Sequence, residues 1–290
     1  MKNAENWNNL NFDDTMKRIL VPTDFSTNAK IAFDYAVHLF DDSEKTFVLL
    51  NAFYIPHSTH DGSFSYHDVS KKDAEQAFVE EERRIQTKYP KLKGKIETHF
   101  EIGAIVDIAQ HFIKEKKIDL MIMGTKGVTG LAEILVGSIA STMIKKVECP
   151  LIVVPEKVNI KPPKKILFTT DKELQSDELN IDPLITIAKE NDAMVHGLYV
   201  SKSPEDLDVK STFIRYDLDL KFKDVRHDLD VDVNKDTVKA IELYVDMHQP
   251  DLIAMISTKG SLFHELFHQS ITKKIAMHTE TPMLIMHQKL

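Results

Sequence analysis

The chain has 290 residues, 42% of them hydrophobic and 28% charged, which is enough for two compact domains of roughly 140 residues each. The net charge of −8 disfavours a nucleic-acid partner, because binding to phosphates needs a basic surface. The sequence has neither an apolar run long enough to span a membrane nor a signal peptide. A single cysteine, Cys149, cannot form an intrachain disulfide, so we expect a reducing, cytoplasmic location.

An internal repeat divides the chain into two similar halves. Three pairs of segments match in the same order: KRILVPTD with KKILFTTD, DLMIMGTKG with DLIAMISTKG, and CPLIVVPE with TPMLIMHQ. This order predicts a duplicated domain. We expect a mobile arm at 1–15, a first domain at 16–156, a stiff proline-containing linker at 157–163 and a second domain at 164–290.

Short apolar segments alternate with amphipathic ones in the first half. In chain order, the expected elements are strand Ile19–Pro22, helix Ala29–Phe40, strand Phe47–Phe53, helix Lys71–Lys88, strand Ile96–Glu101, helix Ile105–Lys116, strand Leu120–Met123, helix Ser138–Val147 and strand Leu151–Val154. The strands are nearly continuous in apolar residues, as in sheets covered on both faces. The pattern predicts a doubly wound parallel α/β sheet.

The second half repeats this order with one contraction. The segment Leu207–Phe222 reads as a shortened helix, although polar and apolar residues alternate over Asp217–Phe222 and also fit an extended strand. The acidic stretch Asp217–Asp236 is expected to face solvent. The apolar last strands, Leu151–Val154 and Met283–Met286, should each lie at a sheet edge.

Two segments of the first half should meet at the carboxyl ends of its strands, where open parallel sheets bind ligands. One is Pro22–Asp24 and the other is Gly124–Ser138, which reads GTKGVTGLAEILVGS. The glycines allow positive φ and close approach to a ligand, and a helix N-terminus attracts phosphate. Lys126 adds positive charge, while the Asp24 carboxylate suits ribose hydroxyls.

The spacing Gly124-x2-Gly127-x9-Gly137-Ser138, together with Pro-Thr-Asp at 22–24, resembles the ATP-binding pattern of the universal stress protein family. The resemblance extends over both halves and implies an adenine nucleotide alpha hydrolase-like, Rossmann-like fold. It implies ATP, with Mg²⁺ as a candidate companion, as the ligand. The implied binding residues are Pro22, Thr23, Asp24, Ala52, Met123, Gly124, Lys126, Gly127, Gly137, Ser138 and Ile139. Ala140 departs from the pattern, because ATP-binding relatives often carry a hydroxyl residue there.

The second half lacks most of this pattern. Ser257 replaces the first glycine, Gly260 keeps the second, and Gln269-Ser270 replaces Gly-Ser. Thr169-Thr170-Asp171 stands in place of Pro-Thr-Asp. Side chains at Ser257 and Gln269 would occupy space that the phosphates need, so we expect this half to be a structural partner without nucleotide.

Other motifs favour ordinary structural roles. The sequence His264-Glu-Leu-Phe-His268 matches a zinc-binding helix motif, but it lies where this fold has a loop and lacks a third ligand. His57, His60, Asp61 and His67 are expected in a solvated loop rather than a metal site. We expect Cys149 to be a buried packing residue.

The sequence therefore predicts a nucleotide-responsive regulatory or interaction module in a stress response. The alternatives are a scaffold that binds no nucleotide and a weak Mg²⁺-dependent ATPase acting through Asp24; no P-loop or kinase motif is present. By the family resemblance the last strand forms a dimer contact. The two halves are expected to pair through it within one chain with pseudo-twofold symmetry, and further homodimerisation and unidentified protein partners remain open.

Overall fold

Strands and helices alternate along the chain, as the sequence predicts. The computed structural model describes residues 16–40, 44–53, 63–92, 94–125, 138–169, 180–201, 203–204, 207–257 and 280–287. The first half contains β1 (Arg18–Pro22), α1 (Thr27–Leu39), β2 (Thr46–Phe53), α2 (Ser63–Lys88), β3 (Lys95–Ile102), α3 (Ile105–Glu115), β4 (Leu120–Gly124), α4 (Ser138–Lys146) and β5 (Leu151–Val154). The second contains β6 (Lys165–Thr169), α5 (Asp182–Glu190), β7 (Met194–Ser201), α6 (Leu207–Lys221), β8 (His227–Val233), α7 (Thr237–His248), β9 (Leu252–Ser257) and β10 (Met283–His287).

The bounds of two helices test the sequence-based expectations. Helix α6 covers Leu207–Lys221, so the shortened helix is confirmed and the extended alternative is wrong. Helix α2 begins at Ser63, eight residues before the predicted start at Lys71. The sequence between Ser63 and Lys71 contains no glycine or proline, so no helix-breaking residue prevents the helix from starting at Ser63. The nearest helix breaker, Gly62, directly precedes Ser63.

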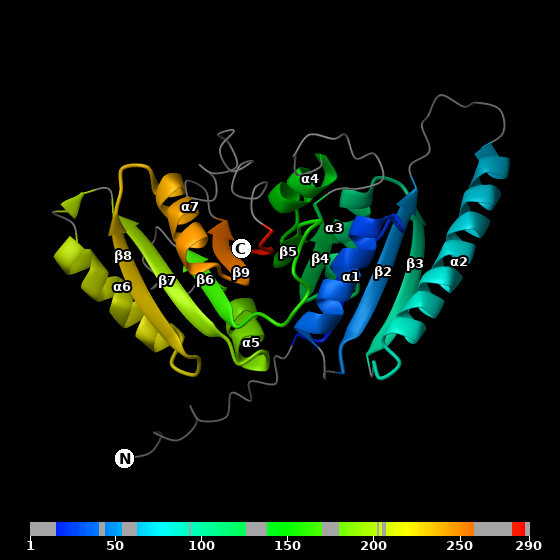
Figure 1. The fold of residues 1–290 in the computed structure, drawn as a ribbon. Helices are drawn as coiled ribbons and strands as arrows, with labels where there is room; N and C mark the ends of the chain where they lie inside the picture. Colours follow the sequence, from blue (N-terminus) through cyan, green and yellow to red (C-terminus); the bar gives the residue numbers. More distant parts are fainter. Residues whose placement is uncertain are drawn as a thin grey trace, which may run out of the picture.

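The two halves share one ten-stranded sheet with the order β3-β2-β1-β4-β5-β10-β9-β6-β7-β8 (Figure 1). Every strand pair is parallel except β5 with β10, which is antiparallel and aligns Leu284 with Ile152. Read from either outer edge, the strands of each half follow the same order: the third, second, first, fourth and fifth strand of that half. The expected pairing of the last strands and the pseudo-twofold arrangement are therefore confirmed.

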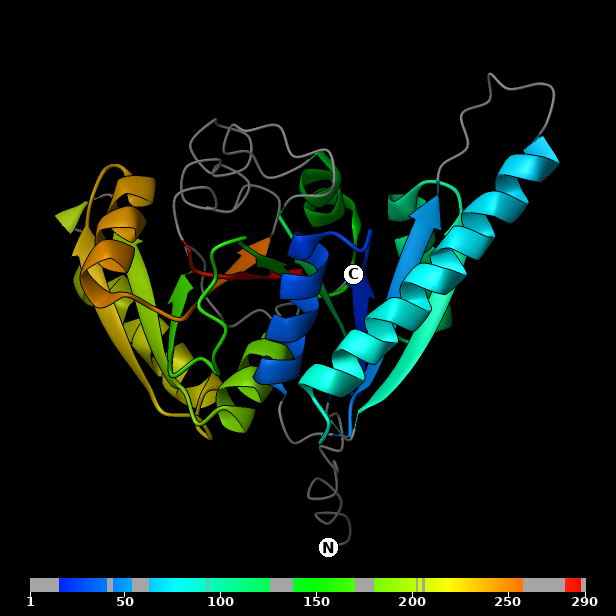
Figure 2. The same ribbon diagram turned by 45° about the vertical axis from the view of Figure 1, so that its right-hand side comes forward.

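Helices cover both faces of this sheet (Figures 1 and 2). Buried side chains of α1, α2, α5 and α6 pack on one face, and those of α3, α4 and α7 pack on the other. Successive strand residues alternate between the two cores: Ile19 and Val21 face the first, and Leu20 faces the second. Both cores draw residues from both halves, so apolar burial continues across the β5–β10 seam.

Polar contacts also join the halves in the helix layer. Lys45 Nζ, whose side chain is 5% exposed, lies 2.7 Å from Glu190 Oε1 at the end of α5. The Asn191 amide donates to the carbonyl of Leu39, at the end of α1, at 3.1 Å. These contacts satisfy buried polar groups at the place where the C-terminal ends of α1 and α5 meet.

The repeat seen in the sequence also recurs as a repeated interaction. Asp119 Oδ2 accepts hydrogen bonds from the backbone amides of Lys17 and Arg18, both at 2.8 Å. Asp251 Oδ2 accepts from the amides of Lys164 and Lys165 at 2.9 and 3.0 Å. In each half an aspartate before the fourth strand therefore anchors the start of the first strand.

One expectation about the acidic stretch is wrong. Asp217 is 3% exposed, and its Oδ2 atom is buried without a hydrogen-bond partner. The residue lies one turn after buried Ile214 and next to buried Leu218, so the helical repeat turns it towards the sheet. The other aspartates of this stretch are exposed, as predicted.

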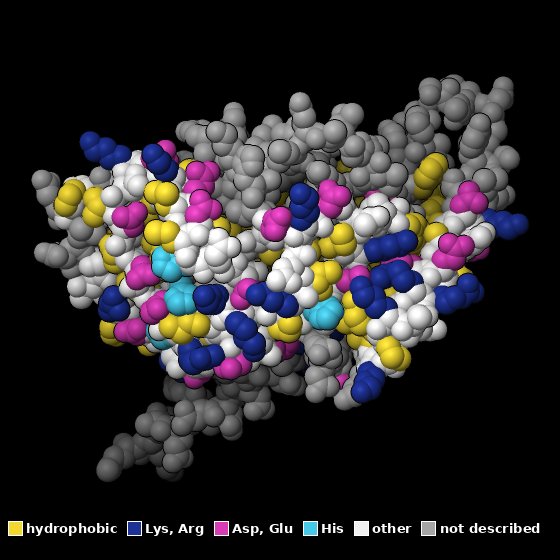
Figure 3. Space-filling model, viewed as in Figure 1, with side chains coloured by type: hydrophobic (Ala, Val, Ile, Leu, Met, Phe, Trp, Pro, Cys, Tyr) yellow, Lys and Arg dark blue, Asp and Glu magenta, His cyan; other side chains and the backbone are white. Residues whose placement is uncertain are grey.

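Acidic and basic side chains are interspersed over the face of the molecule shown in Figure 3. Within the described residues, no helix is both long and apolar enough to cross a bilayer. The same residues bring together no group of three potential metal ligands.

We expect Lys45→Met to lower the free energy of unfolding by about 2 kcal/mol, because it leaves the partly buried Glu190 carboxylate without its cation. The matched control is Lys189→Met, which removes a salt bridge to Asp224 with side chains 46% and 59% exposed. Its cost should stay below about 0.5 kcal/mol. Urea unfolding measures both; equal losses would contradict the assigned role of Lys45 in the junction.

His287 makes stability depend on pH. Burial lowers its pKa from the ordinary value of 6.5, against a smaller opposing effect of Glu148. Below about pH 6.5 the unfolded chain takes up this proton more readily than the folded chain, so stability falls as the pH falls through that window. In urea unfolding at a series of pH values, His287→Gln should reduce the loss; an unchanged pH dependence would show that His287 does not contribute.

Candidate functional site

The carboxyl ends of β1 and β2 are held together beyond their strand pairing. The Thr23 amide donates to the Leu50 carbonyl at 2.8 Å, and the Asn51 side-chain amide donates to the Thr23 carbonyl at 2.7 Å. The predicted Pro22–Asp24 segment therefore lies beside the end of the strand that carries Ala52. Sequence analysis missed Asn51, whose role depends on the register of the two strands.

Asp24 lies in a tight turn between β1 and α1. Its Oδ1 atom accepts from the Ser26 amide at 3.0 Å, and Thr23 Oγ1 accepts from the Phe25 amide at 3.0 Å. Phe25 has a φ of 62°, in the left-handed region that is uncommon for a bulky residue. Ser26 then caps α1 through the Ala29 amide at 3.3 Å. The turn thus fixes the Asp24 carboxylate at the carboxyl end of the sheet.

Strand β4 ends at Gly124, where close packing, and not the expected positive φ, explains why the residue is a glycine. A Cβ atom at this position would lie 2.9 Å from the carbonyl oxygen of Asn28 in α1. Among the described glycines, Gly103 at 144° has a left-handed φ and Gly124 does not. Close packing of α1 therefore requires the glycine at 124, whereas the sequence suggested positive φ. Met123, the preceding residue, is 7% exposed and packs in the core.

Helix α4 begins at Ser138, as predicted. Ser138 and Ile139 are exposed at its N-terminus, and Ala140 is 1% exposed and packs with Met143 against the sheet. The side chain at position 140 points towards the core, so the missing hydroxyl there removes no donor from the exposed end. The first backbone amides of α4 have no partner within the helix and give this end partial positive charge.

The structure thus places Pro22, Thr23, Asp24 and Ala52 together, and puts Met123 and Gly124 at the end of the neighbouring strand β4. Several expected site residues lie outside the described residues: Lys126, Gly127, Gly137, Gly260, Gln269, Ser270, His264, His268, His57, His60 and Asp61. The side chains of Ser257 and His67 also lie outside the description.

Cys149 is a packing residue, as expected. Its side chain is buried among the residues of α3, α4 and the sheet. Burial raises the pKa of its thiol to about 12, so the thiol is protonated at neutral pH.

We expect Gly124→Ala to lower the free energy of unfolding by about 1–3 kcal/mol in the absence of any ligand, because the new methyl group would press on the Asn28 carbonyl. Ser138→Ala, at an exposed helix start, should cost less than about 0.5 kcal/mol. Thermal and urea unfolding measure both. A fully stable Gly124→Ala variant would contradict the packing explanation.

Comparison with known proteins identifies relatives of this chain. The family model described as the universal stress protein family matches residues 15–155. The universal stress protein MJ0531 of Methanocaldococcus jannaschii is 29% identical over 159 residues, which cover 53% of this chain and 88% of the relative. MJ0577 of the same organism is 28% identical and covers 49% of this chain and 96% of the relative.

Similarity in fold extends over both halves. The crystal structure of a universal stress protein from Archaeoglobus fulgidus superposes with a TM-score of 0.71 and 17% identity, and the match covers 95% of this chain and 97% of that one. At this identity the match supports the whole-chain fold alone. The family match over residues 15–155 assigns the first half of the chain to the universal stress protein family.

Proposed function

We propose that the first half of the chain binds ATP at the carboxyl ends of β1, β2 and β4, next to the N-terminus of α4. The observation that carries the proposal is the fixed turn at 22–26, which holds the Asp24 carboxylate where these strands end. Open parallel sheets bind nucleotides at this position in the fold. In Figures 1 and 2, α4 lies at the same end of the sheet as the arrowheads of β2 and β3.

The exposed groups fit the two ends of a nucleotide. A carboxylate has about four lone-pair sites, so Asp24 can accept ribose hydroxyls in addition to the Ser26 amide. The hydroxyl of Ser138 and the free amides at the start of α4 suit phosphate oxygens. By the family pattern, Lys126, Gly127, Gly137 and the main chain at Ile139 complete the phosphate end, with Mg²⁺ as a candidate partner of the triphosphate.

We propose that the second half binds no nucleotide and acts as a structural partner. Strand β6 places Thr169 where β1 has Pro22, since Ile166 and Ile19 occupy equivalent positions in the two strand pairings. Thr169 is 3% exposed and belongs to the interior. The strand registers align Gly124 with Ile256, which is 8% exposed, so the expectation that Ser257 takes the place of Gly124 is wrong, and a larger side chain stands at this position. Because each half repeats the same order of strands and helices, we assign residues 16–156 and 164–290 as two domains.

Such a protein would act as a cytoplasmic regulatory module whose nucleotide state alters its contacts with other proteins during stress. Slow turnover of ATP, if present, would depend on Asp24 and not on Asp171. A scaffold without a working site would show no response to nucleotide at all.

Gly127→Val should abolish the thermal stabilisation by ATP with Mg²⁺, because the branched side chain blocks the approach of the main chain to the phosphates. For a ligand at a hundred times its Kd, the wild-type shift should be about 5 °C. The control Gly260→Val, at the equivalent position of the second half, should keep the full shift. Differential scanning fluorimetry measures both variants; the same response in both would contradict a single working site.

A further inference from the structure

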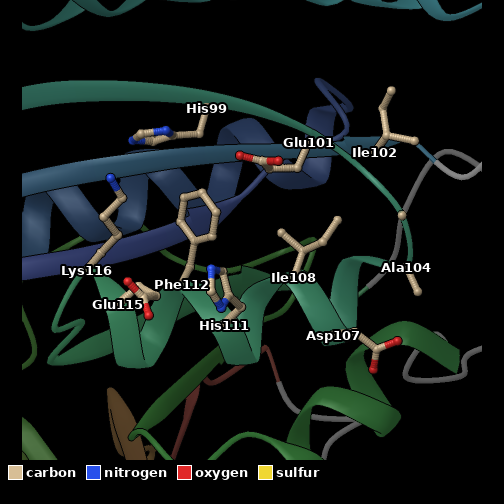
Figure 4. Close-up of a pocket in the computed structure, with 11 residues that line it drawn as sticks. His99, Glu101, Ile102, Ala104, Asp107, Ile108, His111, Phe112, Glu115 and Lys116 are labelled. Carbon is tan, nitrogen blue, oxygen red and sulfur yellow. The ribbon is translucent and has the colours of Figure 1, made fainter.

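A groove separates β3 from α3 at the outer edge of the first half (Figure 4). Its volume is about 650 Å³, within the range typical of ligand sites. The ring of Phe112 contacts that of His99 edge-on, with centroids 5.1 Å apart. Buried His99 Nε2 has no hydrogen-bond partner.

The second half fills the corresponding positions with direct contacts. Leu120 and Leu252 begin the equivalent strands β4 and β9, which matches Phe112 with Tyr244 and Lys116 with His248. The registers of β3 and β8 match His99 with Asp230. There the Tyr244 hydroxyl donates to Asp230 at 2.6 Å, and the Tyr244 and His248 rings stack at 3.9 Å. In the first half Phe112 has no hydroxyl, and Lys116 Nζ lies 6.0 Å from its ring centroid.

The strand that borders the groove also offers unpaired backbone groups. The Lys95 amide donates to the carbonyl of Lys45, just before β2, at 3.0 Å, and the Gly103 amide donates to that of Phe53 in β2 at 2.9 Å. The odd-numbered residues between them direct their backbone groups towards β2. Even-numbered residues therefore direct their N–H and C=O groups to the outer edge. In the part of the chain that the structure describes, no strand pairs with that edge.

The equivalent edge of the second half is partly closed. Strand β8 ends the sheet on its other side, and its outward carbonyl at Leu229 accepts from the Arg215 guanidinium of α6 at 3.2 Å. Leu229 corresponds to Thr98 in β3. An added strand would have to displace Arg215 there. Among the described residues of the first half, no side chain donates to the outward carbonyls of β3.

The charge around the groove is predominantly negative. Glu101 extends from β3, and Asp107 and Glu115 extend from α3 (Figure 4). All three carboxylates are exposed, and Lys116 contributes a positive charge to the lining. An occupant with basic side chains would complement this rim.

We propose that the β3–α3 groove binds an extended basic polypeptide segment, which adds to β3 as a further strand. The backbone of the segment would pair with Ile96, Thr98 and Phe100, and its basic side chains would meet the carboxylates of Glu101 and Glu115. The proposal goes beyond nucleotide binding and uses none of the residues assigned to it.

The test uses the full chain and a fluorescein-labelled octapeptide of alternating lysine and valine, which matches the eight residues of β3. Fluorescence anisotropy at about 150 mM salt should show saturable binding to the wild type. Glu101→Lys/Glu115→Lys should weaken it at least about tenfold, because the rim charge reverses. The matched control Asp232→Lys/Met247→Lys, at the corresponding positions of the second half, should change it less than about twofold.

A second probe separates strand addition from charge attraction alone. The same peptide, N-methylated at alternate residues on its β3-facing edge, keeps its charges but cannot donate to β3, so it should bind at least about tenfold more weakly. Equal binding of both probes would overturn strand addition. Absence of binding to the wild type, or an equal loss in the control variant, would overturn the site itself. Because neither probe is a nucleotide, these outcomes are independent of ATP binding.

Discussion

Antiparallel pairing of β5 with β10 is the contact on which the rest of the structure depends. Each half alone would end in a fully buried, apolar strand with one edge of unpaired backbone groups, which invites aggregation or dimerisation. Pairing within the chain satisfies those groups and joins two five-stranded sheets into one of ten strands. It also brings α1 and α5 together, so that Lys45 meets Glu190 in a largely dry junction. The two halves thus complete each other's sheet edge within a single chain.

The two halves retain the interactions that build the sheet and differ where the sheet meets solvent. Asp119 and Asp251 anchor the first strand of their own half in the same way, each accepting from two successive backbone amides. At the outer edge, by contrast, Phe112 leaves a groove where Tyr244 makes a hydrogen bond. The carboxyl ends diverge as well, with glycine at 124 and isoleucine at the matching position 256.

Local chemistry made much of the fold predictable from sequence. Continuous apolar runs placed the strands, helical spacing placed α1 and α3 to within two residues, and the apolar character of β5 and β10 predicted their pairing. What could not be predicted depends on residues distant in the chain. The close approach of Asn28 explains Gly124, the strand register gives Asn51 its partner, and the groove needs both register and helix packing. Of the proposed ATP site, the sequence predicted which strand ends meet, while the role of the segment around Gly127 in binding phosphate stays a prediction.

Photoaffinity labelling with 8-azido-ATP, followed by mass spectrometry of the cleaved chain, tests most directly whether one half alone holds the nucleotide. A site at the ends of β1, β2 and β4 predicts close to one label per chain, located within residues 16–156 and suppressed by unlabelled ATP with Mg²⁺. Labelling within residues 164–290, equal labelling of both halves, or labelling that excess ATP does not suppress would contradict it.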